Sequence, residues 1–563
     1  MGIKHFYYWY KNNFSTCIQN KIEDVDTLAI DMNGLFHMCA QRIYKYGNSS
    51  AHLFYNSKIQ LLPKTNLTLF RDVCDKIENL RNFIKPKKKI ILCVDGVSGL
   101  GKMNQQRQRR FKTSITNKTN FFNPNCFTPG TKIMDHLTKY IDWYIRSMIN
   151  LNPEWQNLDI ILSNEKVPGE GEHKIMHYLK KYENISEKIC IYGLDADLMM
   201  LGILLPHNNL WLAREPEQGF IEFIDIKQFK NELLKVIRWE RDYLDNNEPV
   251  FDKNYAINDF IVLSFLVGND FLPTIPTISI LDGAIDIILE IYKENGKIYG
   301  HLTEEISNSD ELIFNINSLA HFFKKLGKKE KELMEKKYNS QTPFFPDPLV
   351  IKNMKLIDQR HEINMNLYKQ EYYEKKFPQN TDKKLIIKEY LNGMLWILNY
   401  YKKRIPDWLW FYPFSYGPFL EDFYDFIKNE YQIPIFSQNE PVLPFLQLLM
   451  VLPSNNKDLL PEPLNELMDK ESPLEPFFPT SFEIDLTGKR KDWEGIVILP
   501  SINLDLFKIE YAKKEKLISN SDKKRNIVGK NFIYSYDVTK TDMFSSFYGN
   551  IPECPVSVNL LYF

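Results

Sequence analysis

Four short apolar runs, rich in aliphatic and β-branched residues, divide the first 200 residues of the chain. They are DTLAID ending at Asp31, KIILCVD ending at Asp95, LDIILS at residues 158–163, and KICIYGLD ending at Asp195. Unbroken apolar runs of this length are typical of strands that are buried on both faces of a parallel sheet. The pattern therefore predicts a central sheet whose strands run mostly in one direction.

Helical periodicity follows or separates these runs. Residues 131–150 carry apolar side chains three and four positions apart, and EHKIMHYLKKY after Gly171 is similarly amphipathic. A further helix, NDFIVLSFLVGNDFLP, is expected to begin at a cap at Asn258 and to break between Gly268 and Pro273. Strands that alternate with helices predict an α/β fold in which helices cross over between parallel strands.

The pattern changes twice further along the chain. Residues 296–345 are polar and Lys-rich, notably HFFKKLGKKEKELMEKK, which predicts a connector or an exposed helix. From residue 346 to residue 563 aromatic residues and prolines are dense, which predicts an irregular, tightly packed region. We therefore expect one domain over residues 1–295, a connector over 296–345, and a second region over 346–563.

Composition narrows the class of protein. A length of 563 residues with 44% hydrophobic residues predicts several packed domains rather than a disordered chain. Lys and Arg total 71 against 72 for Asp and Glu, so net charge neither indicates nor excludes a nucleic-acid partner. Seven scattered cysteines without a Cys-x-x-Cys pair are expected to be buried free thiols. With no signal peptide and no membrane-length apolar run, we expect an intracellular, cytoplasmic protein that binds no membrane.

Acidic residues occupy the positions where the strands end. The carboxyl ends of parallel strands converge on one crevice, and seven acids are expected to meet there: Asp31, Asp95, Glu170, Glu172, Asp195, Asp197 and Asp270. A single Asp at a strand end is commonly a helix cap or a turn residue. Four such sites that all carry acids, two of them in pairs, favour a shared role instead.

Carboxylates gathered without a cation would repel one another, and several would have to stay protonated. Divalent cations remove this conflict. A set of oxygen ligands without His or Cys favours Mg²⁺, or Mn²⁺, over zinc. Two such ions activate a water and stabilise the leaving oxygen during attack on a phosphodiester. The cluster therefore predicts a Mg²⁺-dependent nuclease in which all seven acids are catalytic and metal-binding.

A basic stretch follows the second strand directly. In VSGLGKMNQQRQRRFK, four side chains fall on one helical face: Lys102, Gln106, Arg109 and Arg110. Arginine forks give bidentate phosphate contacts and Gln adds a neutral donor. A solvated charged helix would show the same spacing. Because the stretch lies immediately behind Asp95, we favour a phosphate-binding face.

Aromatic residues indicate single-stranded substrate. His37, in DMNGLFH, lies one and a half helical turns beyond Asp31 and is expected to stack on a base. Trp396, Trp408 and Trp410 offer further stacking partners. Tryptophans in such an apolar run are commonly core residues, and that alternative stays open for each of them.

These residues lie in blocks that resemble the eukaryotic 5′-to-3′ exoribonucleases, the Xrn/Rat family. The blocks are MGIKHFYYW, DMNGLFHMC, VDG with KMNQQRQRRF, FTPGT, VPGEGEHKIM, YGLDADLMMLG, FLVGNDFLP, GMLWILNYYKKRIPDWLWFYPFSYGPF, PFLQLLMVLP, DWEGIVILP and KRNIVGKNFIYSYD. They stand in family order over nearly the whole chain. Two departures are a VSGLG loop where the family has a Pro and a further basic residue, and an early end that resembles a minimal member without the long C-terminal extension.

The resemblance implies a PIN/FEN-like catalytic domain and a second, mainly helical region that walls the active site. It implies Mg²⁺-dependent, processive removal of mononucleotides from 5′-monophosphorylated single-stranded RNA, as in mRNA decay, by a chain expected to be a monomer. By motif, the seven acids match the metal ligands, and Lys102, Gln106, Arg109 and Arg110 match the 5′-phosphate pocket. His37 and Trp396 match the residues that stack on the terminal bases.

Two other functions remain open from the residues alone. One is a structure-specific 5′ DNA nuclease built on the same acidic cluster, since contacts to a 2′-hydroxyl cannot be read from a sequence. The other is a catalytically inactive RNA-binding scaffold, which is disfavoured because no acid of the cluster is replaced.

Overall fold

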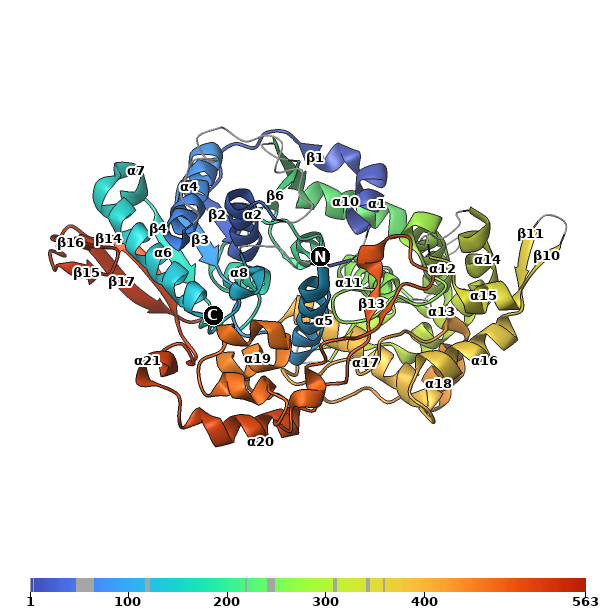
Figure 1. The fold of residues 1–563 in the computed structure, drawn as a ribbon. Helices are drawn as coiled ribbons and strands as arrows, with labels where there is room; N and C mark the ends of the chain where they lie inside the picture. The colour runs from blue at the N-terminus through green and yellow to red at the C-terminus, as the bar shows by residue number, and fades with distance from the viewer. Residues whose placement is uncertain are drawn as a thin grey trace.

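A nine-stranded mixed sheet forms the centre of the fold (Figure 1). The structure, a computed structural model, describes residues 2–3, 5–46, 65–116, 122–217, 220–239, 249–306, 311–340, 345–357 and 360–563. The strand order is β1-β7-β6-β5-β2-β3-β4-β14-β17. These strands span β1 Ile18–Gln19, β2 Thr27–Asp31, β3 Lys89–Cys93, β4 Asp159–Ser163, β5 Lys188–Tyr192, β6 Asn209–Glu217, β7 Phe220–Asp225, β14 Asn531–Tyr536 and β17 Val556–Leu561.

The four predicted strands are the four neighbours at the middle of this sheet. β5, β2, β3 and β4 pair in parallel, and β6 extends the parallel part beside β5. All five residues of β2 are buried, as an apolar run in a central strand requires. In the register, Asp31 lies beside Cys93, which in turn lies beside Ser163. The carboxyl ends of three strands are therefore level with one another.

Helices cover both faces of the sheet. On one face, Leu28 and Ile30 of β2 belong to the hydrophobic core that α2, α4 and α6 share. On the other face, Ala29 belongs to the core formed with α8, α9, α11 and α17. The helices span α1 Phe6–Asn13, α2 Met32–Tyr44, α4 Asn66–Ile84, α5 Leu100–Thr116, α6 Lys132–Leu151, α7 Pro153–Gln156, α8 Gly171–Tyr182, α9 Asp197–Leu204, α10 Ile226–Ile237 and α11 Lys253–Ser264.

The remaining part of the chain is mainly helical. Its helices span α12 Ala284–Tyr299, α13 Ile316–Gly327, α14 Glu330–Ser340, α15 Pro348–Asn353, α16 Met365–Lys376, α17 Lys383–Lys402, α18 Phe423–Asn429, α19 Pro444–Val451, α20 Leu504–Glu515 and α21 Asn520–Lys523. Four two-stranded ribbons join them: β8 Thr303–Glu305 with β9 Leu312–Phe314, β10 Met354–Ile357 with β11 Arg360–Ile363, β12 Ile484–Asp485 with β13 Ile496–Val497, and β15 Phe544–Ser546 with β16 Gly549–Ile551. The predicted fold class, an α/β sheet flanked by helices with a second helical region, is confirmed.

Two helix starts can be compared with the predicted ones. α6 begins as expected, because Thr131 caps it and its hydroxyl accepts the amide N–H of Met134 at 3.3 Å. The predicted cap at Asn258 is wrong. Asp252 caps α11 instead, accepting two amide N–H groups, and Asn258 lies inside the helix at 1% exposure. The predicted break is present at Gly268, whose φ of 85° ends the helical stretch.

The segment at residues 296–345 differs from the expected polar connector. Its helix α13 buries four apolar side chains at helical spacing, Leu319, Phe322, Phe323 and Leu326. The lysines that made the segment look polar occupy the other face of the helix, with Lys324 exposed. The periodicity of the apolar positions, rather than the content of lysine, decides where this helix lies.

The C-terminal residues return to the first domain. β14 pairs antiparallel with β4, with Phe532 beside Leu162, and β17 pairs with β14. Figure 1 shows these red strands beside the cyan helix α6. The predicted regions 1–295 and 346–563 therefore share one sheet. In the second region, part of the stretch expected to be irregular is the 20-residue helix α17, whereas residues 403–443 contain only one 3₁₀ turn and α18.

All seven cysteines are buried free thiols, as expected. Among the described residues no helix has both the length and the apolar character that a membrane crossing needs.

Candidate active site

The carboxyl edge of the parallel strands brings four of the predicted acids together around Gly171. Asp31 is the last residue of β2, Asp95 follows β3, and Glu170 and Glu172 flank Gly171 at the start of α8. The amide N–H of Gly171 donates to Oδ1 of Asp95 at 2.7 Å. A Cβ at this glycine would lie 2.7 Å from Oδ1 of Asp31. Glycine is therefore required where the helix meets the two strand ends.

The other three acids belong to neighbouring segments of the chain. Asp195 follows β5, and Asp197 is the first residue of α9. Asp270 lies in the turn that begins at Gly268. Oδ1 of Asp197 accepts the amide N–H of Ile3 at 3.1 Å, so the N-terminal segment also reaches the cluster.

Two tyrosines of helix α17 hold the cluster from the helical region. The hydroxyl of Tyr400 donates to Oε1 of Glu170 at 2.8 Å, and that of Tyr401 donates to Oδ2 of Asp197 at 2.9 Å. Both hydroxyls are buried, so these bonds are made away from water. No local sequence pattern indicates this role, because the partners lie 230 and 204 positions apart along the chain.

The ammonium group of Lys102 lies among the acids. It bonds to Oε2 of Glu170 and, at 2.9 Å, to Oδ2 of Asp270, and its side chain is only 14% exposed. Gln105 adds a bond from Nε2 to Oδ1 of Asp270 at 3.4 Å. Lys102, predicted to bind phosphate, therefore serves in this structure as a counter-ion for two of the acids.

The ammonium of Lys102 does not neutralise the whole cluster. Burial and the neighbouring carboxylates of Asp95 and Asp195 raise the pKa of Asp31 well above its usual value. Burial, opposed by Lys102 and reinforced by Glu170, raises the pKa of Glu172 in the same way. Burial and the carboxylate of Asp270 raise the pKa of Asp197 to about 6. The cluster therefore carries more negative charge than its protein neighbours stabilise.

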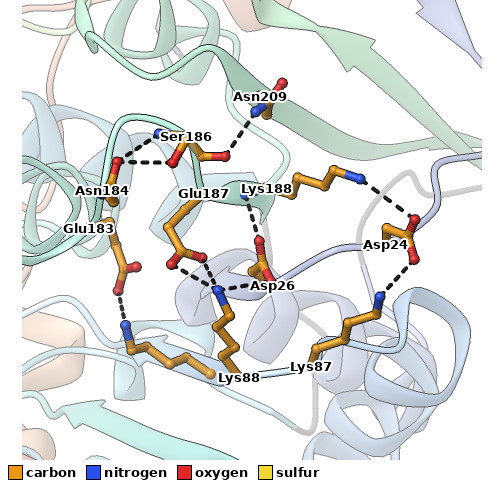
Figure 2. Close-up of polar contacts among 11 residues, drawn as sticks. Asp24, Asp26, Lys87, Lys88, Glu183, Asn184, Ser186, Glu187, Lys188 and Asn209 are labelled. Carbon is orange, nitrogen blue, oxygen red and sulfur yellow. Dashed lines mark hydrogen bonds and ion pairs between the residues drawn. The ribbon is translucent and has the colours of Figure 1, made fainter.

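The opposite edge of the same sheet provides a contrast (Figure 2). There the acids at the amino ends of the strands each face an ammonium. The pairs are Lys87 with Asp24 at 2.7 Å, Lys88 with Asp26 at 3.2 Å and with Glu187 at 3.0 Å, and Lys89 with Glu183 at 2.7 Å. Lys87, Lys88 and Lys89 are thus used in ion pairs, and acids in excess of cations are a property of the carboxyl edge.

The donor chemistry at the carboxyl edge fits a hard divalent cation. Oδ1 of Asp31 and Oε2 of Glu172 are buried and have no hydrogen-bond partner. All the candidate ligands are oxygens, which Mg²⁺ prefers. Within the described residues, however, no three His, Cys, Asp or Glu side chains are arranged to hold a metal ion. The seven acids as metal ligands thus remain a prediction.

Beyond Lys102, helix α5 presents the other predicted phosphate contacts beside His37. Arg110 and Gln106 are buried, and neither Nη1 of Arg110 nor Oε1 of Gln106 has a partner. Burial, with a further contribution from Arg109, lowers the pKa of Arg110 to about 9. Burial and the charges of Arg109 and Arg110 lower the pKa of His37 to about 3. On this face of α5, therefore, a buried arginine has a donor without an acceptor.

The opposite side of α5 is fixed to the C-terminal region. Nη1 of Arg107 donates to the carbonyl of Pro500 at 2.8 Å and Nη2 to that of Phe477 at 2.6 Å. Lys112 donates to the carbonyls of Asp492 and Gly495. The helix is thus held between the sheet edge and residues 477–500.

The tryptophan predicted to stack on substrate is enclosed. Trp396 has no exposed surface, stacks on Trp410 with ring centroids 5.1 Å apart, and donates its indole N–H to the carbonyl of Asp407. It has no open face for a base, so the core alternative describes it. Trp408, the third candidate, is half-buried, with its carbonyl accepting the amide N–H of Leu100.

A tryptophan that was not predicted, Trp493, is instead 54% exposed, and its ring centroid lies 6.1 Å from that of His5. Its charged neighbours in KDWE were the available sequence signal.

Comparison with known families matches most of the chain. A model described as the XRN 5′-3′ exonuclease N-terminus matches residues 1–216, and one described as the Xrn1 helical domain matches residues 250–344 and 360–555. The first match contains six of the seven acids and all of α5. The second contains Asp270 and both tyrosines of α17.

Curated relatives resemble the chain along its length. The 5′-3′ exoribonuclease 1 of Saccharomyces cerevisiae is 26% identical over 98% of this chain and 46% of its own length. The 5′-3′ exoribonuclease 2 homolog of Drosophila melanogaster is 27% identical over 95% of this chain and 73% of its own. The chain thus spans less than half of the yeast relative. A solved structure, the catalytic core of Rad2 in complex with DNA substrate, covers 76% of this chain and is itself covered to 95%, at 14% identity and a TM-score of 0.32. That score supports no statement about this chain.

Proposed function

Because this chain belongs to the family of XRN 5′-3′ exonucleases, we propose that it is a 5′-to-3′ exoribonuclease. It removes mononucleotides processively from single-stranded RNA that carries a 5′ monophosphate, and it acts as a monomer. The observation that carries the proposal is the combination of two opposite excesses of charge: more buried acids than cations at the carboxyl edge, and a buried arginine without an acceptor for its Nη1 on α5. A phosphodiester substrate with its metal supplies both missing charges.

The acids at the carboxyl edge would hold Mg²⁺. Asp31 and Glu172, whose buried oxygens lack partners, are the first candidates, with Asp95, Glu170, Asp195, Asp197 and Asp270 around them. When bound, such ions supply an activated water and stabilise charge on the leaving oxygen. The protein holds the acids in place: Gly171 N–H orients Asp95, and Tyr401 orients Asp197.

The pocket on α5 would receive the 5′ phosphate. Arg110 has a buried Nη1 donor without an acceptor, and Arg109 stands exposed at the same face. A phosphate there accepts charge-assisted hydrogen bonds and relieves the repulsion between the two arginines. His37 lies near both arginines and is partly exposed, and we place a terminal base against its ring. Lys102 would be available to the phosphate if a bound metal ion neutralised Glu170 and Asp270.

Exposure favours Trp493 over Trp396 as the second stacking residue. Residues 492–495 pack against α5, because Lys112 of this helix donates to the carbonyls of Asp492 and Gly495. Lys112 lies about one helical turn along the chain from Arg109 of the phosphate-binding face. The ring of Trp493 is open to solvent while that of Trp396 is not.

Asp195→Ala tests the catalytic role of the acids. We expect the variant to lose cleavage of end-labelled RNA in Mg²⁺ by at least a hundredfold, while its affinity for RNA in EDTA changes less than threefold, because the acid acts on the reacting phosphate and not on the rest of the strand.

Asp24→Ala is the matched control. Asp24 is an exposed acid at the opposite edge of the same sheet, paired with Lys87 (Figure 2). It should leave cleavage unchanged. Full activity in Asp195→Ala, or activity in EDTA, would refute the metal-dependent site. Cleavage of DNA in preference to RNA would favour a structure-specific DNA nuclease instead.

A further inference from the structure

A second cavity lies beside the active site, on the side of the helical region. It has a volume of about 170 Å³ and lies between the loop after Asp270, helices α14 and α16, and the β12–β13 ribbon. None of the seven acids lines it. The N-terminal segment links the two places, because Ile3 bonds to Asp197 and His5 lines the cavity, with Nε2 3.2 Å from Oε1 of Glu494. A ligand in the cavity would thus lie next to the catalytic edge.

The acids that line this cavity already have donors. Asp485 accepts bonds from Lys376, from the hydroxyl of Tyr416 at 2.5 Å, and from Thr487 through both its amide and its hydroxyl. Asp347 accepts the amide of Leu349 at 2.9 Å. Protein donors therefore occupy these carboxylates, which leaves them poor ligands for a cation.

Two cations on the walls keep unused donors. Arg490 gives Nη2 to both carboxylate oxygens of Asp282, at 2.7 and 2.9 Å, but its buried Nη1 has no acceptor. Lys337 gives one N–H to the carbonyl of Pro276 at 3.1 Å, and an ammonium has three. Burial lowers the pKa of Lys337, an effect that Asp282 opposes and Arg490 reinforces. A buried donor without an acceptor is costly, so the pair indicates a ligand rich in acceptors.

We propose that this cavity binds a sugar phosphate unit of a nucleotide. The phosphate oxygens accept from Nη1 of Arg490 and Nζ of Lys337, and the sugar lies against the rings of Tyr338 and Tyr416. A water needs about 10–15 Å³ of such volume, so the cavity has room for a ligand on the order of ten water-sized groups. A released nucleoside monophosphate and an internal nucleotide of the RNA strand both carry this unit. Only the source of the ligand rests on the proposed exoribonuclease function.

Titration calorimetry in EDTA tests binding without cleavage. Ribose 5-phosphate, adenosine 5′-monophosphate and a ten-nucleotide RNA are the three probes. We expect ribose 5-phosphate to bind, and Lys337→Met and Arg490→Lys each to weaken its binding at least tenfold. Lys336→Met, at the exposed neighbouring lysine of the same helix, should leave binding unchanged. Tighter binding of adenosine monophosphate than of RNA identifies the released product as the source, and the reverse order identifies the strand.

Protection of wild-type Lys337 is a second measurement that needs no variant to fold. Saturating ribose 5-phosphate should slow amine acylation of Lys337, followed by mass spectrometry, at least fivefold relative to Lys336. The proposal is wrong if wild type does not bind ribose 5-phosphate, or if Lys337→Met binds it as tightly as wild type does. It is also wrong if Lys102→Met, rather than Lys337→Met, loses binding, because that result locates the ligand at the acidic cluster. An inactive protein that binds as expected would remove the exoribonuclease function and leave this site in place.

Discussion

The ammonium group of Lys102 forms ion pairs with two acids of the cluster, Glu170 and Asp270. Burial lowers the pKa of Lys102, but the carboxylates of Asp270 and Glu170 outweigh it and raise this pKa well above its usual value. The residue therefore stays charged at neutral pH and competes with any other cation for the same two carboxylates.

Replacing Lys102 by Met should make stability depend on metal. Without the ammonium, Glu170 and Asp270 repel, so we expect the melting temperature in EDTA to fall by about 1 °C, which corresponds to roughly 1 kcal/mol in a chain of 563 residues. Added Mg²⁺ should raise the melting temperature of the variant more than that of wild type. Thermal unfolding in EDTA and in Mg²⁺ measures both.

Lys112→Met is the control for that experiment, because Lys112 lies on the same helix and donates to the backbone carbonyls of Asp492 and Gly495. If Lys102→Met and Lys112→Met respond equally to Mg²⁺, the counter-ion role of Lys102 is wrong.

Tyr401 acts on the reaction through Asp197. Its hydroxyl donates at 2.9 Å to a carboxylate that burial and Asp270 make difficult to ionise. Such a bond favours the ionised, ligand-competent form of the acid. Tyr401 is thus a positioning residue supplied by the helical region.

Tyr401→Phe should slow catalysis without weakening RNA binding. A hydrogen bond to a charged group contributes about 1.5–3 kcal/mol, so we expect kcat to fall roughly tenfold or more with KM nearly unchanged. Tyr412→Phe removes an equally buried hydroxyl, whose acceptor is the carbonyl of Tyr416, and should leave kcat unchanged. A rise in KM at constant kcat would contradict the positioning role.

At the scale of elements, the packing of α13 indicates whether residues 296–345 are a connector or a part of the hydrophobic core. Phe323 has no exposed surface and stacks on Phe423 of α18, with centroids 4.3 Å apart. The helix therefore belongs to the core that also contains α17 and its two tyrosines.

Phe323→Ala should destabilise the protein by about 3–5 kcal/mol, the usual cost of emptying a buried phenylalanine site. Urea unfolding measures this. The exposed neighbour Lys324→Ala should change the free energy of unfolding by less than about 0.5 kcal/mol. A loss below about 1 kcal/mol in Phe323→Ala would restore the interpretation of this segment as a connector.

The elements that the sequence predicted well are those defined by local pattern. Four apolar runs became the middle strands, and the acids after them lie at one edge because parallel strands end level. The start of α11 was missed because Asp252 and Asn258 are both good caps, and the residues between them decide the choice through packing. β14 was missed because its partner β4 lies some 370 positions earlier, a pairing that no local pattern encodes.

At the scale of the whole molecule, the active site depends on segments from the full length of the chain. The N-terminal segment binds Asp197, α17 binds two acids, and residues 477–500 fix the helix that carries the cations. The two ends of one sheet differ accordingly. Charges are paired at the amino edge (Figure 2) and left in excess at the carboxyl edge, where a metal-bound phosphodiester would balance them. The seven acids and the cations were readable from sequence, whereas the tyrosines, the place of Lys102 and the enclosure of Trp396 follow from tertiary packing.

The most direct test is the degradation of two RNAs that differ only in their 5′ end, one with a monophosphate and one with a triphosphate, each carrying a label at the 5′ or the 3′ terminus. In Mg²⁺ we predict that the monophosphorylated RNA is degraded at least tenfold faster, and that the 5′ label appears at once as mononucleotide while the 3′ label is released last. Equal rates on the two RNAs, or early internal fragments, would contradict a site that reads the 5′ phosphate beside its catalytic acids.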